Sequence, residues 1–257
     1  MKISGNTILV TGGGTGIGRA FAETFLRLDN KVIIAGRTEE NLKEVVTANS
    51  GIEYLQLDIA AAETIEPFVQ NALKLYPDIN VLMNNAGIMR VEDLQGDHLE
   101  VAEATVATNL LGPIRLTTAF MPHLLKQKQA TIMNVTSGLA SVPMCTHPTY
   151  SATKSALHSY SISLREQLIG TNVRVVEIVP PYVQTTLTGS AHAEDPNAMP
   201  LAEYIKESIQ ILEGDPDVEE VLVERVKIIR NAEREGRFNE VLQFITKTAL
   251  KQKSERK

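Results

Sequence analysis

The stretch Thr7-Ile-Leu-Val-Thr-Gly-Gly-Gly-Thr-Gly-Ile-Gly18 decides the fold. Its apolar start predicts a buried strand, and the apolar residues that follow it recur at helical spacing. Glycines between a strand and a helix allow a tight turn and leave the amides of the helix N-terminus open to a pyrophosphate. The spacing departs from the strict G-x-G-x-x-G pattern, so a purely structural glycine turn is the alternative. The candidate phosphate-binding residues are Gly12, Gly14, Thr15, Gly16, Ile17 and Gly18.

Short apolar runs alternate with stretches of helical periodicity along most of the chain. We expect strands at residues 7–10, 31–35, 52–57, 81–83, 131–135 and 173–178. We expect helices after the glycine turn and at residues 38–48, 98–126 and 150–169, with an adjustment at Pro113. Such alternation is typical of parallel strands joined by right-handed crossovers. The sequence therefore predicts a single-domain α/β fold, a Rossmann-type doubly wound parallel sheet of six strands with helices on both faces.

The composition changes after Pro180. Residues 185–200 are polar and rich in turn-forming residues, and residues 201–212 have the pattern of an amphipathic helix. Asp215-Pro216 predicts an N-cap followed by the first residue of a further helix that reaches Ile229. We expect one domain over residues 1–257, with a cofactor half at 1–90, a lid and extra C-terminal helices at 186–235, and a flexible tail at 251–257.

The bulk composition is that of a soluble globular protein, with 43% hydrophobic and 22% charged residues among 257. A net charge of −6 argues against nucleic acid or an anionic membrane as the main partner. The single cysteine, Cys145, cannot form an internal disulfide, and no apolar run approaches the roughly 20 residues that span a bilayer. We therefore expect a cytoplasmic protein.

The five histidines show no metal-ligand spacing, and we expect no metal site. His147 and His192 fall in predicted pocket loops, where they either contact substrate or lie at the surface.

The end of the second predicted strand bears on the choice of dinucleotide. An NAD site usually has an acidic residue there, whereas this chain has Ala35-Gly-Arg-Thr38. The guanidinium of Arg37 could bind a 2′-phosphate through paired donors, or it could be a solvated arginine at a helix start. We expect NADP(H) to be preferred, with NAD(H) as the alternative. Asp58, after the third strand, either accepts a hydrogen bond from an adenine amino group or caps a helix.

Tyr150 and Lys154 lie four residues apart in a predicted helix and therefore share one of its faces. An ammonium group close to a phenol favours the phenolate and lowers the tyrosine pKa from its usual value of about 10. The spacing therefore predicts a tyrosine that exchanges protons near neutral pH.

With these residues in view, the chain closely resembles the classical short-chain dehydrogenases/reductases over residues 5–188. The resemblance rests on the order and intervals of the glycine turn, Asn84-Asn-Ala-Gly87, Asn109, Ser137 and Tyr150-x-x-x-Lys154. The C-terminal region resembles the DltE-like branch of these oxidoreductases, on Ala198-Met-Pro-Leu201, Leu222-Val-Glu-Arg225 and Ala232-Glu-Arg-Glu-Gly236.

The resemblance implies a role for each matching residue. Tyr150 would be the general acid/base, Ser137 would orient the substrate oxygen, Lys154 would hold the nicotinamide ribose and lower the tyrosine pKa, and Asn109 would position a relay water. Asn84 would support the sheet. Cofactor contacts are implied for Asp58, Ile59, Asn85, Ala86, Gly87, Tyr150, Lys154, Pro180, Val183 and Thr185.

The chain departs from the family pattern in two places. Pro180-Pro181-Tyr182 replaces the usual proline-glycine, and Tyr182 either lines the substrate pocket or packs under the loop. The usual seventh strand is not evident, so we expect six strands and a homodimer through the helices near residues 98–126 and 150–169, with a tetramer as the alternative.

The sequence thus predicts a carbonyl reductase/alcohol dehydrogenase that prefers NADPH and acts on a small molecule. Leu139, Met144 and Tyr182 are candidate substrate contacts, under a lid formed by residues 187–199. One alternative is a binding protein that senses NADP(H) without turnover. A sugar-nucleotide epimerase would normally need a larger C-terminal substrate region.

Overall fold

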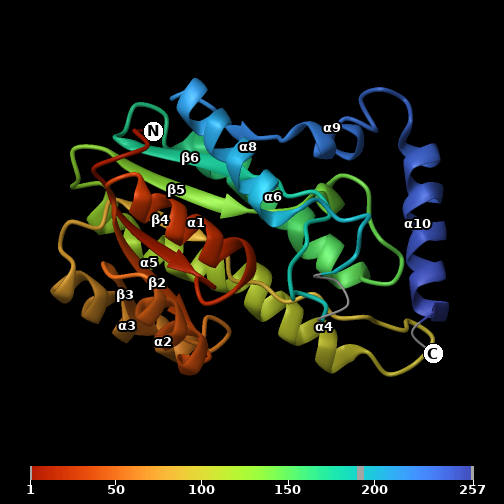
Figure 1. Ribbon diagram of the computed structural model, residues 1–257, viewed down its shortest axis with the longest axis horizontal. Helices are drawn as coiled ribbons and strands as arrows, with labels where there is room; N and C mark the ends of the chain where they lie inside the picture. The colour runs from red at the N-terminus through yellow and green to blue at the C-terminus, as the bar shows by residue number, and fades with distance from the viewer. Residues whose placement is uncertain (1, 190–193, 256–257) are drawn as a thin grey trace.

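The computed structural model describes residues 2–189 and 194–255. Within these residues, seven parallel strands form one sheet in the order β3-β2-β1-β4-β5-β6-β7 (Figure 1). The strands are β1 (Thr7–Thr11), β2 (Lys31–Gly36), β3 (Ile52–Gln56), β4 (Val81–Asn84), β5 (Ala130–Val135), β6 (Val173–Ile178) and β7 (Glu220–Val221). The predicted α/β fold with a doubly wound parallel sheet is confirmed.

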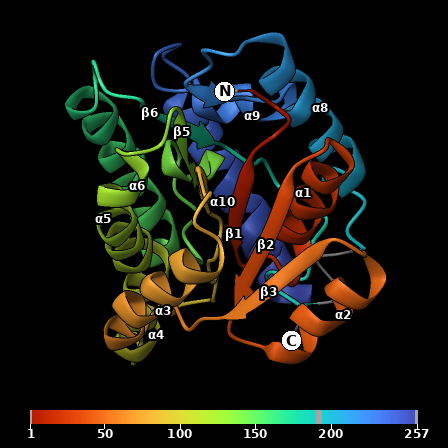
Figure 2. The same ribbon diagram turned by 90° about the vertical axis from the view of Figure 1, so that its left-hand side faces the viewer.

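Helices cover both faces of the sheet (Figure 2). They are α1 (Gly16–Arg27), α2 (Glu39–Ala48), α3 (Ala62–Leu75), α4 (Leu99–Val106), α5 (Gly112–Leu124), α6 (Pro148–Gln167), α8 (Leu201–Gly214), α9 (Glu224–Arg230) and α10 (Phe238–Glu255). Alternate strand residues supply the two cores: Ile8 and Val10 pack with α1 and α8, whereas Leu9 packs with α3 and α5. Because both faces are covered, the central strands are apolar on both sides.

The predicted strand count of six was wrong, because Glu220 and Val221 form a short seventh strand beside β6. The sequence placed these two residues in a helix starting at Asp215-Pro216. Instead, Asp215 closes a turn by accepting the amide of Asp217, and the helix α9 begins only at Glu224. A strand of two residues has no periodicity of its own, so only its pairing with β6 reveals it.

The predicted helix at residues 98–126 consists of three segments. A π-helical turn, η1 (Ala107–Leu111), separates α4 from α5, and Pro113 lies in the first turn of α5. π-Helical turns are rare in proteins, and those that occur often lie at functional sites. Here the turn contains Asn109, which is fully buried.

The C-terminal helix α10 lies at one end of the molecule, away from the sheet (Figure 1). Its Val241 and Ile245 pack with Val142, which follows β5, and with Ala232. The helix continues to Glu255, further than expected into the charged end of the chain, and residues 256–257 lie outside the described residues. None of the helices in the described part of the chain is long and apolar enough to cross a membrane.

Candidate active site

The order in which the chain adds strands to the sheet reverses between β1 and β4. The strands β2 and β3 lie on one side of β1, and β4 to β7 lie on the other. Ligands of doubly wound sheets bind at the carboxyl ends of the strands at such a point. The glycine turn after β1 and the segment Asn85–Gly87 after β4 flank it. The two segments that the sequence singled out for a cofactor therefore meet at this edge.

Close approach explains two of the glycines. Gly12 has a φ of +65°, and a Cβ there would lie 2.9 Å from the Ala86 Cα. A Cβ on Gly18 would lie 2.3 Å from Asn85 Nδ2 and 2.4 Å from the Gly12 oxygen. The Asn85 side chain donates to the Thr11 oxygen over 2.9 Å, so it holds the glycine turn against β4. The side-chain amide of Asn85 is thus already hydrogen-bonded to the backbone of the glycine turn.

The N-terminus of α1 fits a pyrophosphate. Its first turn contains no acid, and among the described residues Thr15 makes no side-chain cap. The side chain of Thr185 lies 3.5 Å from where a Gly16 Cβ would be, so Thr185 adjoins the turn. Gly14 is buried, and Ile17 packs partly against the core. Open amides, a positive helix end and the neighbouring Thr15 and Thr185 suit an anionic group.

Three more predicted cofactor residues follow β2 and β3. Arg37 is exposed, and within residues 2–189 and 194–255 its guanidinium has no ion-pair partner. Asp58 accepts the Ala60 amide over 3.1 Å, so its carboxylate closes a turn before α3 and is not the cap of that helix. Ile59 is buried and lies where a Cβ on Gly112 would clash, so its side chain belongs to the core.

Tyr150 and Lys154 lie on one face of α6, where they are 7% and 4% exposed. The Lys154 ammonium donates to the Val135 oxygen over 2.7 Å and lies 5.6 Å from the centre of the Tyr150 ring. Burial raises the pKa of Tyr150 to about 12, against a smaller opposite effect of its hydrogen bond with Ser137. Burial likewise lowers the pKa of Lys154 to about 8, and Glu177 opposes that shift.

The predicted lowering of the Tyr150 pKa is therefore wrong for this structure. The reason is physical: both side chains are removed from water, and the lysine is directed at a backbone carbonyl and not at the phenol oxygen. Burial therefore favours the protonated form of the Tyr150 phenol.

Ser137 follows β5 and caps the short 3₁₀ turn η2 (Gly138–Ala140), because its Oγ accepts the Leu139 amide over 3.1 Å. The next amide, of Gly138, donates to the Pro180 oxygen over 3.0 Å. Ser137 thus caps this turn and also faces Tyr150. The turn after β6 lies beside it.

Asn109 is held by a two-way contact with Ile88: its Oδ1 accepts the Ile88 amide and its Nδ2 donates to the Ile88 oxygen, each over 2.8 Å. A Cβ on Gly87 would lie 3.3 Å from Asn109 Oδ1 and 3.7 Å from Lys154 Nζ. Gly87, Asn109 and Lys154 therefore converge. The π-helical turn provides the local geometry, and the relay water that the resemblance implied for Asn109 stays a prediction.

Beneath these groups, buried amides connect the strands. Asn84 donates to Asn134 over 2.9 Å, and Asn134 donates to Ser161 of α6 over 2.9 Å. The expected support of the sheet by Asn84 agrees with these bonds.

Sequence reasoning missed two acidic residues. Glu92 is 5% exposed and accepts the amide and the hydroxyl of Thr149, over 3.1 and 2.6 Å, at the N-terminus of α6. Glu177 of β6 is 1% exposed and contacts His158 of α6. Fifty-seven and nineteen residues separate these pairs, so local spacing could not have found them.

The candidate substrate residues Leu139, Met144 and Tyr182 have different neighbours in the structure, and their contact with a substrate stays a prediction. Leu139 and Met144 pack against the cluster that α10 forms with Val142, and Met144 also lines a cavity of about 510 Å³ that neither Tyr150 nor Lys154 lines. Tyr182 donates its hydroxyl to Asp195 over 2.8 Å, which favours the loop-packing alternative. Val183 is buried and bridges to Met199. His147 is buried beside Thr146, and His192 lies outside the described residues.

Comparisons with known proteins agree on one protein family. The model of the short chain dehydrogenase family matches residues 6–196. The oxidoreductase DltE of Bacillus subtilis (strain 168), described as uncharacterized, is 40% identical over 239 residues, which are 91% of this chain and 94% of that protein. The NADP-dependent 3-hydroxy acid dehydrogenase YdfG of Shigella flexneri is 32% identical over 181 residues, covering 70% and 73% of the two chains.

A solved structure agrees with these matches. A short chain dehydrogenase from Burkholderia cenocepacia J2315 in complex with NADP superposes with a TM-score of 0.79 and 26% identity, covering 94% of this chain and 99% of that one. The predicted resemblance, including its DltE-like branch, is confirmed. The chain is an oxidoreductase that belongs to the short-chain dehydrogenase family.

Proposed function

We propose that this protein is an NADPH-preferring carbonyl reductase that also works in reverse as an alcohol dehydrogenase. One observation carries the proposal: Ser137, Tyr150 and Lys154 gather, buried, at the carboxyl edge of the sheet, with Asn109 adjoining them. The glycine turn, which suits a pyrophosphate, lies at the same edge.

The chain's own residues suit proton transfer to a carbonyl oxygen. A bound nicotinamide cofactor would supply the hydride. Negative charge then develops on the carbonyl oxygen, and the hydroxyls of Ser137 and Tyr150 are donors for it. Tyr150 is protonated at neutral pH, because its pKa is about 12, and donates its proton to that oxygen. The Lys154 ammonium, 5.6 Å from the ring centre, stabilises the tyrosinate that remains.

The preference for NADPH rests on Arg37. Its exposed guanidinium follows β2, where the family places the adenosine ribose, and it is available for a 2′-phosphate. A charge-assisted contact is worth about 1.5–3 kcal/mol, so Arg37→Ala should raise the Michaelis constant for NADPH roughly tenfold or more. The constant for NADH serves as the internal control and should stay the same. An unchanged NADPH constant would remove the support for this preference.

NADPH oxidation against a panel of ketones, aldehydes and diketones tests the reaction. Tyr150→Phe should lower kcat by roughly 10²-fold or more, because the proton donor is lost. Tyr160→Phe is the matched control, since Tyr160 lies on the same helix and has no role in the proposal. Equal rates for Tyr150→Phe and the unmodified protein would refute the assignment. Tight NADPH binding without turnover on the whole panel would favour the NADP(H)-sensing alternative.

We also propose a homodimer through the helical region at residues 98–126, which comprises α4, η1 and α5, and through α6. Leu99 on α4 is 63% exposed and Ile162 on α6 is 42% exposed, so both helices keep apolar surface in the single chain. Light scattering should give twice the chain mass, and Ile162→Glu should reduce it to one. A monomeric unmodified protein would contradict the proposal.

A further inference from the structure

We propose that Glu177 is a positioning residue for this active site: its buried carboxylate joins the strand end that carries Ser137 to the helix that carries Tyr150 and Lys154. The proposal rests on the function proposed above. It assigns a role to a group that lies outside the motifs of the sequence.

The carboxylate of Glu177 first contacts the end of strand β5 through Thr136. Thr136 donates its hydroxyl to Glu177 Oε1 over 2.6 Å, and its amide donates to the Ile178 oxygen over 2.9 Å. Thr136 lies between Val135, whose oxygen accepts the Lys154 ammonium, and Ser137, which faces Tyr150. A shift of Thr136 would therefore move both neighbouring contacts.

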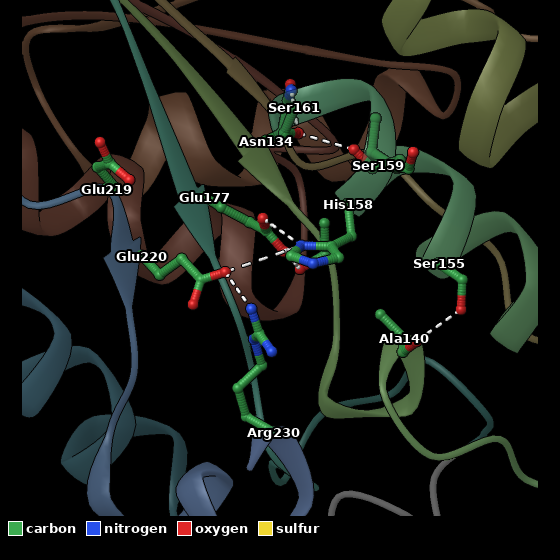
Figure 3. Close-up of polar contacts among 12 residues, drawn as sticks. Asn134, Ala140, Ser155, His158, Ser159, Ser161, Glu177, Glu219, Glu220 and Arg230 are labelled. Carbon is green, nitrogen blue, oxygen red and sulfur yellow. Dashed lines mark hydrogen bonds and ion pairs between the residues drawn. The ribbon is translucent and has the colours of Figure 1, made fainter. Parts of the chain in front are cut away.

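The same carboxylate also contacts helix α6 through His158. His158 Nδ1 lies 2.7 Å from Glu177 Oε2 and 3.0 Å from Oε1 (Figure 3). His158 is four residues beyond Lys154 and eight beyond Tyr150, so the three side chains share one face of α6. One carboxylate thus contacts His158, one turn beyond Lys154 on α6, and Thr136 at the strand end.

The C-terminal region completes the cluster. Glu177 pairs with Glu220 in the β6–β7 register, and Glu220 Oε1 lies 3.8 Å from His158 Nδ1 and 2.6 Å from an Arg230 nitrogen (Figure 3). Ligand atoms of His158, Glu177 and Glu220 lie within 4.8 Å of one another, a spacing that a metal ion could use. The Arg230 guanidinium, however, already supplies positive charge to Glu220, and Thr136 and His158 occupy Glu177. We therefore infer a cross-link between protein groups.

Glu177 also acts on Lys154 through charge. Burial lowers the pKa of Lys154 to about 8, and the negative charge of Glu177 counteracts this. The titratable and charged groups around the carboxylate are His158 and Lys154 from α6, Glu220 from β7 and, beyond Glu220, Arg230 from α9. Removing the charge of Glu177 should thus make the ammonium of Lys154 lose its proton at lower pH.

Glu177→Gln is the decisive variant, because it keeps the size and an acceptor for Thr136 but removes the charge. We expect kcat for the best carbonyl substrate to fall about tenfold or more, with the NADPH Michaelis constant within about twofold. The alkaline limb of the pH profile should move down by about one pH unit. Glu220→Gln is the control: it alters the neighbouring carboxylate and should leave kcat within about twofold and the limb in place.

A second pair of variants separates positioning from folding. His158→Asn retains a nitrogen donor near the Nδ1 position and should keep most of kcat, whereas His158→Leu should lose about tenfold. Unmodified kcat and an unmoved alkaline limb in Glu177→Gln would overturn the proposal. Equal losses in Glu177→Gln and Glu220→Gln would overturn it too, because they would indicate a general effect of the cluster on folding.

A readout without turnover keeps this test independent of the proposed function. The Lys154 ammonium is titrated by NMR in the unmodified protein and in Glu177→Gln, with Lys154→Ala used to assign the signal. A lower Lys154 pKa in Glu177→Gln supports the proposal even if no carbonyl compound is reduced. An unchanged Lys154 pKa refutes it even if carbonyl reduction is confirmed.

Discussion

The N-terminus of α6 offers a sharp test of how the candidate active site is held in place. The first turn of α6 contains no acidic residue, so the sequence of the helix itself supplies no charge to complement its dipole. Glu92, from the loop after β4, supplies it: the carboxylate is 5% exposed and accepts both the amide and the hydroxyl of Thr149. We predict that Glu92→Gln destabilises the fold although it is almost isosteric.

The magnitude follows from these contacts. A hydrogen bond to a charged group contributes about 1.5–3 kcal/mol, and one between neutral groups about 0.5–1.5 kcal/mol. Two bonds lose that charge assistance, and the helix dipole loses a partner worth about 0.3–1 kcal/mol. The free energy of unfolding should therefore fall by about 2–4 kcal/mol, which for a chain of this size lowers Tm by roughly 4–16 °C.

Equilibrium unfolding in urea, followed by circular dichroism, measures this change. Glu100→Gln is the matched control, because Glu100 lies in the first turn of α4 but is exposed. It should lose less than about 1 kcal/mol. In a Thr149→Val background the Glu92→Gln effect should shrink, since the hydroxyl partner is already absent. A Glu92→Gln loss below about 0.5 kcal/mol, or one equal to that of Glu100→Gln, would refute the reasoning.

Three further predictions concern the turn, the pH profile and the C-terminal helix. Gly18→Ala should lose NADPH binding, measured by fluorescence, because its Cβ would meet Asn85 and Gly12 within 2.4 Å, whereas Gly214→Ala, with no atom within 4 Å, should bind normally. Carbonyl reduction should decline as pH rises through about 8, where Lys154 loses its charge, and Lys154→Arg should lack this limb; a flat profile in the unmodified protein would contradict it. Ile245→Ala should lower the free energy of unfolding by about 2–5 kcal/mol, because Ile245 is 6% exposed, and Phe244→Ala, at a 70% exposed site, by under about 0.5 kcal/mol; similar losses would disprove the packing of α10.

The local sequence pattern was sufficient to predict most of the strands of the sheet and the protein family. Strands such as β2 are continuous apolar runs, and the glycine turn needs residues without a Cβ at fixed positions. Both features can therefore be recognised from residues that are adjacent in the sequence. β7 left no such signal, because its two residues form a strand only through their pairing with β6. The Asp215-Pro216 pair was misleading for a related reason: turns and helix starts share the same residue types.

The sequence by itself determined which groups are candidates for the chemistry, since Ser137, Tyr150 and Lys154 stand in the order typical of the family with a glycine turn ahead of them. Only the tertiary structure decided the ionisation of these groups, because burial raises the pKa of Tyr150 and lowers that of Lys154, and burial depends on how α6 packs against the sheet. The tertiary structure also selected Glu92 and Glu177 among many acidic residues. Their roles come from contacts with residues distant in the chain, which no spacing along the sequence encodes.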